Sequence, residues 1–111
     1  MIEKRLLDYL SVALDVPCHM EMPEKVSGQF VVIEKTGTYQ LNKITQATFA
    51  VQSYGPTLYD AALLNEQVKA AMEGLVERDD ISRVQLNSDY NYTDTAMKRY
   101  RYQAVFVVTY Y

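Results

Sequence analysis

Cysteine and histidine are almost absent from this 111-residue chain, and tryptophan is missing altogether. The one cysteine is Cys18, and the one histidine is its neighbour, His19. A lone cysteine excludes an intramolecular disulfide and any zinc site with several cysteine ligands. Neighbours on an extended chain point to opposite faces, so these two are poorly placed to hold one metal ion or to act as a nucleophile–base pair. We therefore expect no metal and no cofactor, and we expect Cys18 to be a small buried hydrophobe on a strand.

Glycine is also scarce, and the four glycines form none of the motifs that bind phosphate or position a catalytic serine. The patterns GxGxxG, GxxxxGK and GxSxG are all absent, and one histidine cannot supply the HExxH zinc motif. Glu77, Asp79 and Asp80 directly follow an expected helix, where a solvated turn is a commoner role for carboxylates than acid–base catalysis. The sequence therefore predicts a protein without enzymatic activity.

Long apolar runs and a strong charge of one sign are missing as well. No run approaches the roughly 18 apolar residues of a membrane span, and charges interrupt the N-terminal MIEKRLLDYL where a signal peptide would be apolar. Eleven basic and 14 acidic residues give a net charge of −3, which exerts no general attraction on nucleic acid or anionic membranes. Residues 98–102 alternate basic and aromatic side chains, as single-strand nucleic-acid binders do, but an exposed strand explains three positive charges equally well. We expect a cytoplasmic chain that binds neither membranes nor specific nucleic acids.

The residues that are present, 49% apolar and 23% charged, are typical of one globular domain, which we assign to residues 1–111. Apolar residues recur every four positions over 2–14, which predicts an amphipathic helix. A second helix begins after Thr57, with Asp60 in the capping-box position, and ends near Val76. Its apolar stripe follows 3-4-3-4 spacing and consists of Ala61, Leu64, Val68, Ala71 and Leu75.

Alternating and β-branched segments predict the strands, which cover residues 18–22, 30–35, 44–54, 81–93 and 99–110. Residues 36–43 are polar, and we expect them to form a long hairpin loop that projects from the body. Phe49 and Val51 share the strand face that we expect to pack on the second helix. The element order α-β-β-β-α-β-β predicts an α+β fold, with a mostly antiparallel sheet of about five strands packed against two amphipathic helices.

Tyrosine is frequent, with ten tyrosines against three phenylalanines, and four of the tyrosines flank one loop near the C-terminus. A hairpin centred on Ala96 would pair them on one face of the sheet, as Tyr92 with Tyr100 and Tyr90 with Tyr102. Cross-strand aromatic pairs stabilise a hairpin by roughly 0.2–1 kcal/mol each. Tyrosine also combines a large apolar area with a polar tip, so the same residues are candidates for a protein contact surface.

The expected loop 36–43 holds two further candidates, Tyr39 and Leu41, which have no nearby core to join. We expect this loop to be mobile in the free protein and to become ordered against a neighbouring subunit. The candidate assembly interface then comprises Tyr39, Leu41, Tyr90, Tyr92, Tyr100 and Tyr102.

Segments spread over nearly the whole chain carry a family resemblance. They are the helix MIEKRLLDYL, PCHMEMPE at 17–24, FVVIEKTG at 30–37, ATFAVQSY at 47–54, the alanine-rich second helix and RYRYQ at 99–103. In this order and at these lengths they resemble the small tail-terminator, tail-completion or head–tail joining proteins of long-tailed bacteriophages, in the versions found in phages and prophages of Gram-positive bacteria. This family has no catalytic signature.

The resemblance implies a non-enzymatic virion protein of the tail or neck that is made in the host cytoplasm. Such proteins form a ring, commonly a hexamer, on the end of the tail tube, where the ring stops tube polymerisation and docks onto the head connector. The implied partners are further copies of the chain, the tail tube protein and the head-completion or connector protein. Three alternatives stay open: another neck or minor capsid protein, a small α+β ligand-binding or regulatory module, and an enzyme with an unfamiliar site.

Overall fold

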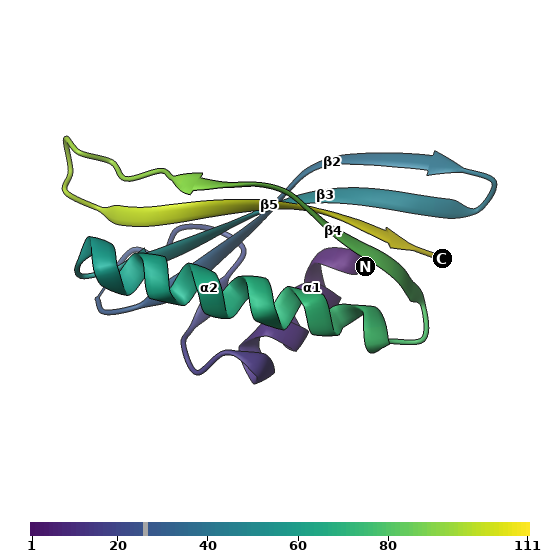
Figure 1. Ribbon diagram of the computed structural model, residues 1–111, viewed down its shortest axis with the longest axis horizontal. Helices are drawn as coiled ribbons and strands as arrows, with labels where there is room; N and C mark the ends of the chain where they lie inside the picture. The colour runs from purple at the N-terminus through teal and green to yellow at the C-terminus, as the bar shows by residue number, and fades with distance from the viewer. Residues whose placement is uncertain (26) are drawn as a thin grey trace.

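Two helices lie on one face of a five-stranded sheet in the computed structural model, which describes residues 1–25 and 27–111 (Figure 1). The elements in chain order are α1 (Ile2–Ala13), β1 (Cys18–His19), β2 (Phe30–Leu41), β3 (Ile44–Gly55), α2 (Leu58–Gly74), the 3-10 turn η1 (Leu75–Glu77), β4 (Ile81–Asn91) and β5 (Tyr100–Tyr110). The strand order is β1-β2-β3-β5-β4, and every neighbouring pair is antiparallel except β1 and β2, which run parallel. The structure thus confirms the α+β class, the predicted element order and a mostly antiparallel sheet.

The hydrophobic core lies between the helices and the sheet face that they cover. Alternation along β3 turns Phe49 and Val51 toward the helices, and both side chains are fully buried. Four members of the predicted α2 stripe are buried as well: Ala61, Leu64, Val68 and Leu75. Ala71 is partly buried against the same core. Helix α1 adds a second apolar stripe to this layer, formed by Ile2, Leu6, Leu10 and Leu14.

Helix α2 begins where the sequence predicts. Thr57 is the N-cap in an extended conformation, and its side-chain oxygen accepts a 3.1 Å hydrogen bond from the backbone N–H of Asp60. Gly55, at the end of β3, lies so close to the first turn of α2 that an added Cβ would come within 2.8 Å of the Ala61 nitrogen. A glycine here therefore lets the chain turn sharply from the central strand into the helix that covers it.

The prediction of a loop at residues 36–43 is wrong, because these residues form a β-hairpin. Strand β2 continues to Leu41 and pairs with β3 as far as Ile44, with one irregularity between Lys35 and Gly37. The connection is the two residues Asn42 and Lys43, whose φ angles of 53° and 67° fit the turn with two positive φ values that matches the twist of a hairpin. Part of this hairpin is exposed on both faces, so it lacks the apolar alternation that marks a half-buried strand.

Two other predicted boundaries also move. The first strand covers only Cys18–His19 instead of residues 18–22, because it pairs with β2 only at Val31 and Val32. Strand β4 ends at Asn91 rather than Thr93. The hairpin from β4 to β5 nevertheless continues past this end through an isolated bridge between Asp94 and Arg99.

Replacing Leu64 with alanine tests the core assignment. The Leu64 side chain is fully buried between α2 and the sheet, so we expect the free energy of unfolding to fall by about 2–5 kcal/mol. The matched control is Leu63→Ala, because Leu63 is the next residue of the same helix and is 44% exposed. Urea unfolding followed by circular dichroism is the measurement, and equal midpoints for the two variants would contradict the assignment of this helix face.

Candidate functional site

The sheet has a second face, which we call the open face, on the side away from both helices (Figure 1). The strand registers assign to it Phe30, Val32, Glu34, Gly37, Tyr39 and Leu41 of β2, Ile44, Gln46, Thr48, Ala50, Gln52 and Tyr54 of β3, Arg83, Gln85, Ser88 and Tyr90 of β4, and Arg101, Gln103, Val105, Val107 and Thr109 of β5. Tyr92 continues the β4 row, since its N–H donates to the Arg101 carbonyl. Near one corner, Met22 packs on a small cluster of Phe30, Val32 and Tyr54.

Arg101 organises one end of the open face. The rings of Phe30 and Tyr54 stack with centroids 4.5 Å apart and planes 7° from parallel. The Arg101 guanidinium donates a 2.9 Å hydrogen bond to the Tyr54 hydroxyl, and its central carbon lies 4.4 Å from the centre of the Tyr92 ring. Its Nε also donates to the Tyr92 carbonyl oxygen at 2.6 Å. Arg101 therefore joins Tyr54 of β3 to Tyr92, just beyond the end of β4, by hydrogen bonding and cation–π contact, and the stack on Tyr54 adds Phe30 of β2 to this unit.

Two glutamines extend this unit across the middle of the sheet. The Tyr54 hydroxyl donates to Gln52 Oε1 at 3.3 Å, and Gln52 Nε2 donates to Gln103 Oε1 at 2.8 Å. Gln103 Nε2 in turn donates to the Tyr90 hydroxyl. Because the polar atoms of this chain satisfy one another, the side chains hold fixed positions before any partner arrives. Phe30, Tyr54 and Gln103 are themselves buried, so this network holds in place the more exposed rings of Tyr90 and Tyr92, and such preorganised aromatic groups suit contact with another protein.

The predicted cross-strand tyrosine pairs are wrong, because the register differs from the prediction by one residue. Tyr90 lies opposite Gln103, and Tyr102 lies opposite Asn91. The bridge between Asp94 and Arg99 encloses an even number of residues, so the hairpin is centred after Ala96 and not on it. A shift of one residue turns a side chain to the other face of a sheet.

As a result, Tyr90 and Tyr92 share the open face and pack edge to face along one strand, with centroids 5.8 Å apart. Tyr100 and Tyr102 lie on the opposite face, on the helix side, and are half-buried. The six candidate residues are therefore not brought together in one cluster.

Tyr39 and Leu41 lie on the open face at the tip of the β2–β3 hairpin. Their side chains are 61% and 58% exposed, and Ile44 beside them is 42% exposed. The prediction that this segment is an unpaired loop is wrong, but the apolar side chains at its tip are as free of the core as expected. Four of the candidate residues thus share the open face, with Tyr39 and Leu41 at one end and Tyr90 and Tyr92 at the other.

An ion pair that the sequence analysis missed ties α2 to β4. The Lys69 ammonium lies 2.6 Å from Asp89 Oδ2 and 2.9 Å from Glu66 Oε1. Asn65, which is buried within the apolar stripe of α2, donates from its side-chain amide to Asp89 Oδ1 at 2.6 Å. Hydrogen bonds from Lys69 to Asp89 and Glu66 raise the pKa of Lys69 above its ordinary value. The asparagine in an otherwise apolar stripe was the one sequence signal for this contact.

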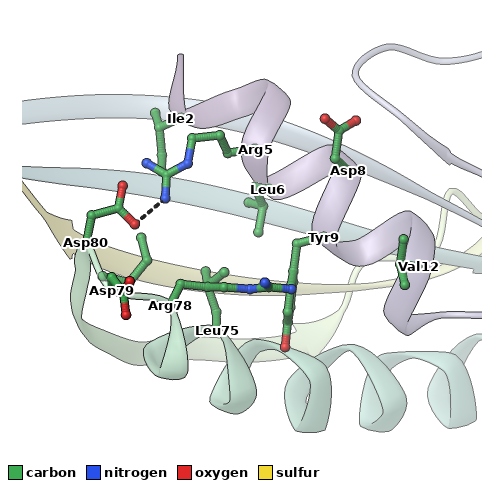
Figure 2. A pocket seen from close by; sticks show the side chains of 11 residues that line it. Ile2, Arg5, Leu6, Asp8, Tyr9, Val12, Leu75, Arg78, Asp79 and Asp80 are labelled. Carbon is green, nitrogen blue, oxygen red and sulfur yellow. Dashed lines mark hydrogen bonds and ion pairs between the residues drawn. The ribbon is translucent and has the colours of Figure 1, made fainter.

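A groove of about 550 Å³ lies between α1 and the segment that joins α2 to β4 (Figure 2). Arg5 pairs with Asp80 across it at 2.5 Å, which lowers the pKa of that carboxyl. The Arg78 guanidinium lies 5.2 Å from the centre of the Tyr9 ring, and the Tyr9 hydroxyl donates to the Ala71 carbonyl at 2.6 Å. These contacts link α1 to α2 and to the segment before β4, so Arg5, Tyr9, Arg78 and Asp80 of the groove already have structural partners.

Cys18 and His19 point to opposite faces of the sheet, as predicted. Cys18 packs against the core on the helix side, and burial raises the pKa of its thiol. The His19 ring lies on the open face, 6.2 Å from the Phe30 ring in an edge-on arrangement. Within residues 1–25 and 27–111, no group of three or more histidine, cysteine, aspartate or glutamate side chains is placed to hold a metal ion.

Comparison with known proteins leaves the family open. No protein-family model matches the chain, and no curated protein sequence matches it. In the part of the chain that the structure describes, no helix is long and apolar enough to cross a membrane.

Replacing Lys69 with glutamine tests the link between α2 and β4. At neutral pH we expect the free energy of unfolding to fall by about 1–2 kcal/mol, because Asp89 loses a charged hydrogen-bond partner in a partly shielded site. A lysine pKa that is raised by folding stabilises the protein fully below the unfolded value of about 10.4, and this stabilisation is lost as the pH rises through the folded value. The difference between wild type and Lys69→Gln should therefore shrink above about pH 10.4.

The matched control for this experiment is Lys4→Gln, which breaks the exposed pair of Lys4 with Asp8 on α1. Exposed pairs contribute little, so this change should leave stability almost unaltered. Guanidinium unfolding of the three proteins at several pH values provides the comparison. Equal losses for the two variants would mean that the Lys69 pair has no special role in joining the elements.

Proposed function

We propose that this chain is a structural subunit of a long-tailed bacteriophage: a tail-terminator or head–tail joining protein that caps the tail tube as a ring and docks it to the head connector. The observation that carries the proposal is the open face, a preorganised aromatic and amide surface with exposed apolar side chains at both ends. The order and length of the sequence segments supply the resemblance to the family, in which such rings are commonly hexameric. On this proposal the protein acts in the tail or neck of the virion and has no catalytic activity.

The size of the open face fits a contact with another protein. The four long strands have 11 or 12 residues each. With a rise of about 3.3 Å per residue and a spacing of about 4.8 Å, they make a face of roughly 35 Å by 19 Å. Its area of roughly 700 Å² approaches the about 800 Å² that each partner contributes to a standard protein interface.

The sheet edges supply further contact surface. Strand β4 forms one edge of the sheet along its whole length. At the other edge, β1 pairs with β2 only at Val31 and Val32, so within the described chain the outer side of β2 is unpaired from Ile33 to the hairpin tip. Exposed edges are ready to pair with other chains, and a monomeric protein usually shields them. Two long edges are thus consistent with a chain that works in an assembly.

The ligand-binding alternative has less support. The groove beside α1 has a volume within the range of small-molecule sites. Its arginines and its tyrosine, however, are engaged in contacts that join α1 to α2 and to the start of β4. A different neck protein could use the open face equally well, and only the identity of the partner separates that alternative from a terminator.

The experiment that tests the proposal is arrest of tail-tube growth. Purified chain is added to tubes growing from the tube protein of the same phage, and tube lengths are measured by electron microscopy. We expect the wild-type chain to bind at tube ends and to stop elongation. The Tyr39→Ser/Leu41→Ser double variant should need about 10–100 times more protein for the same arrest, because two exposed apolar anchors are lost without loss of core packing.

The control is Tyr59→Ser/Leu63→Ser on α2, which removes the same two residue types from exposed positions away from the open face. This variant should arrest tubes as the wild type does. A wild-type chain that leaves tube length unchanged but binds the head connector would replace the terminator proposal with that of another neck protein. A chain that binds neither partner would overturn both.

A further inference from the structure

A cationic hollow lies at the end of the sheet where β2 and β5 begin and β3 ends. Its volume is about 170 Å³, and its walls are formed by Phe30, Tyr54 and Tyr100 together with Lys98 and Arg99. We use the name cationic hollow for this space and the five residues just named. None of the residues that line it carries a carboxylate, and none of the ion pairs in the described parts of the chain uses Lys98 or Arg99. Two charges without a counter-charge, set beside aromatic rings, are suited to receive an anionic group with an apolar neighbour.

An acidic turn lies at the opposite end of the sheet. Between α2 and β4 the exposed side chains of Val76, Glu77 and Asp79 follow one another closely, and we call these three residues the acidic turn. Within the described chain, neither Glu77 nor Asp79 takes part in an ion pair. Strand β5 connects the two ends, since Tyr100 lines the hollow and the N–H of Tyr111 donates to the carbonyl of Asp80 beside the turn. At about 3.3 Å per residue, the two sites are roughly 33 Å apart.

We propose that the acidic turn of one copy docks into the cationic hollow of the next copy. Glu77 and Asp79 would meet Lys98 and Arg99, and Val76 would pack on the aromatic walls. The inference rests on the proposed function, because it names the contact through which copies join into a ring. Two different patches at opposite ends of a subunit form a head-to-tail contact, which is the type that generates a ring when the rotation closes. It uses only the Phe30 and Tyr54 corner of the open face and leaves the exposed side chains of Tyr39, Leu41, Tyr90 and Tyr92 for the tube.

The charges make this contact sensitive to salt. Ion pairs at an accessible interface are screened when the ionic strength rises. The hollow is small, so the contact between two free copies should be weak and should strengthen when a tube end holds the copies side by side. We therefore expect association of the free chain at millimolar concentration and low salt, and its loss at 0.5 M salt.

A charge-swap experiment tests the contact. The variant Lys98→Glu/Arg99→Glu has an acidic hollow, and the variant Glu77→Lys/Asp79→Lys has a basic turn. Each should be monomeric alone, because turn and hollow then carry the same sign. In an equal mixture, the acidic turn of the first variant meets the basic hollow of the second, and the basic turn of the second meets the acidic hollow of the first. The fraction of associated chain should therefore be at least ten times that of either variant alone. Sedimentation velocity at low salt is the measurement, and thermal melting checks that each variant is folded.

Two control variants carry the same charge changes at exposed positions elsewhere. Lys43→Glu/Arg83→Glu is the basic control, in which Lys43 shares with Lys98 a positive φ angle. Asp15→Lys/Glu73→Lys is the acidic control. Both should associate as the wild type does. The inference is overturned if the wild type stays monomeric at low salt, if either swapped variant associates alone, or if the mixture fails to restore association.

The outcome for the contact can be separated from the outcome for the proposed function. If the swapped variants associate alone and still arrest tubes, the proposed contact is refuted and the proposed terminator function is supported. If the charge-swapped variants associate only when mixed but the wild-type chain does not arrest tubes, the proposed contact is supported and the proposed terminator function is refuted.

Discussion

The structure depends on one constraint: both helices lie on the same face of the sheet, so the other face is buried only in part, around Phe30, Val32 and Tyr54. The central pair of strands, β3 and β5, packs Phe49, Val51 and Phe106 beneath α2 and α1 and supplies the main core. The other face has to be stabilised within its own plane. The stack of Phe30 on Tyr54, with Met22 packed against it, and the hydrogen-bonded chain from Tyr54 across the sheet do this without a covering helix. The same arrangement leaves a rigid surface that another protein can meet at little cost in conformational entropy.

The two proposed contacts use different parts of the molecular surface. The open face and the hairpin tip present apolar groups, which suit a broad contact with a tube or connector. The ends of the sheet present opposite charges, with Lys98 and Arg99 at one end and Glu77 and Asp79 at the other. Broad apolar contact supplies most of the free energy of association, whereas charge complementarity sets orientation and register. A subunit built this way would join its neighbours weakly in solution and firmly once a tube end orders them.

Local sequence patterns predicted the helices and the core. The features that they missed depend on pairing between residues far apart in the sequence. Helical spacing located Leu64 and Val68, and a capping residue located the start of α2 at Thr57. The hairpin at 36–43 was missed because strands exposed on both faces have no apolar alternation. The faces of the tyrosines depend on how many residues the bridge of Asp94 to Arg99 encloses, which propensity does not reveal. The hollow lined by Lys98 was missed because it joins strand ends that are far apart in sequence.

Side-chain footprinting tests the central claim, that the open face is free in the monomer and covered in the assembly. Hydroxyl radicals oxidise exposed side chains, and mass spectrometry of the free and tube-bound chain reports the extent at each residue. The account predicts a several-fold fall in oxidation at Tyr39, Leu41, Tyr90 and Tyr92 on binding, and no change at Tyr59 on α2. Protection of Tyr59 with unchanged oxidation of the open face would show that the helix side makes the contact and would contradict the account.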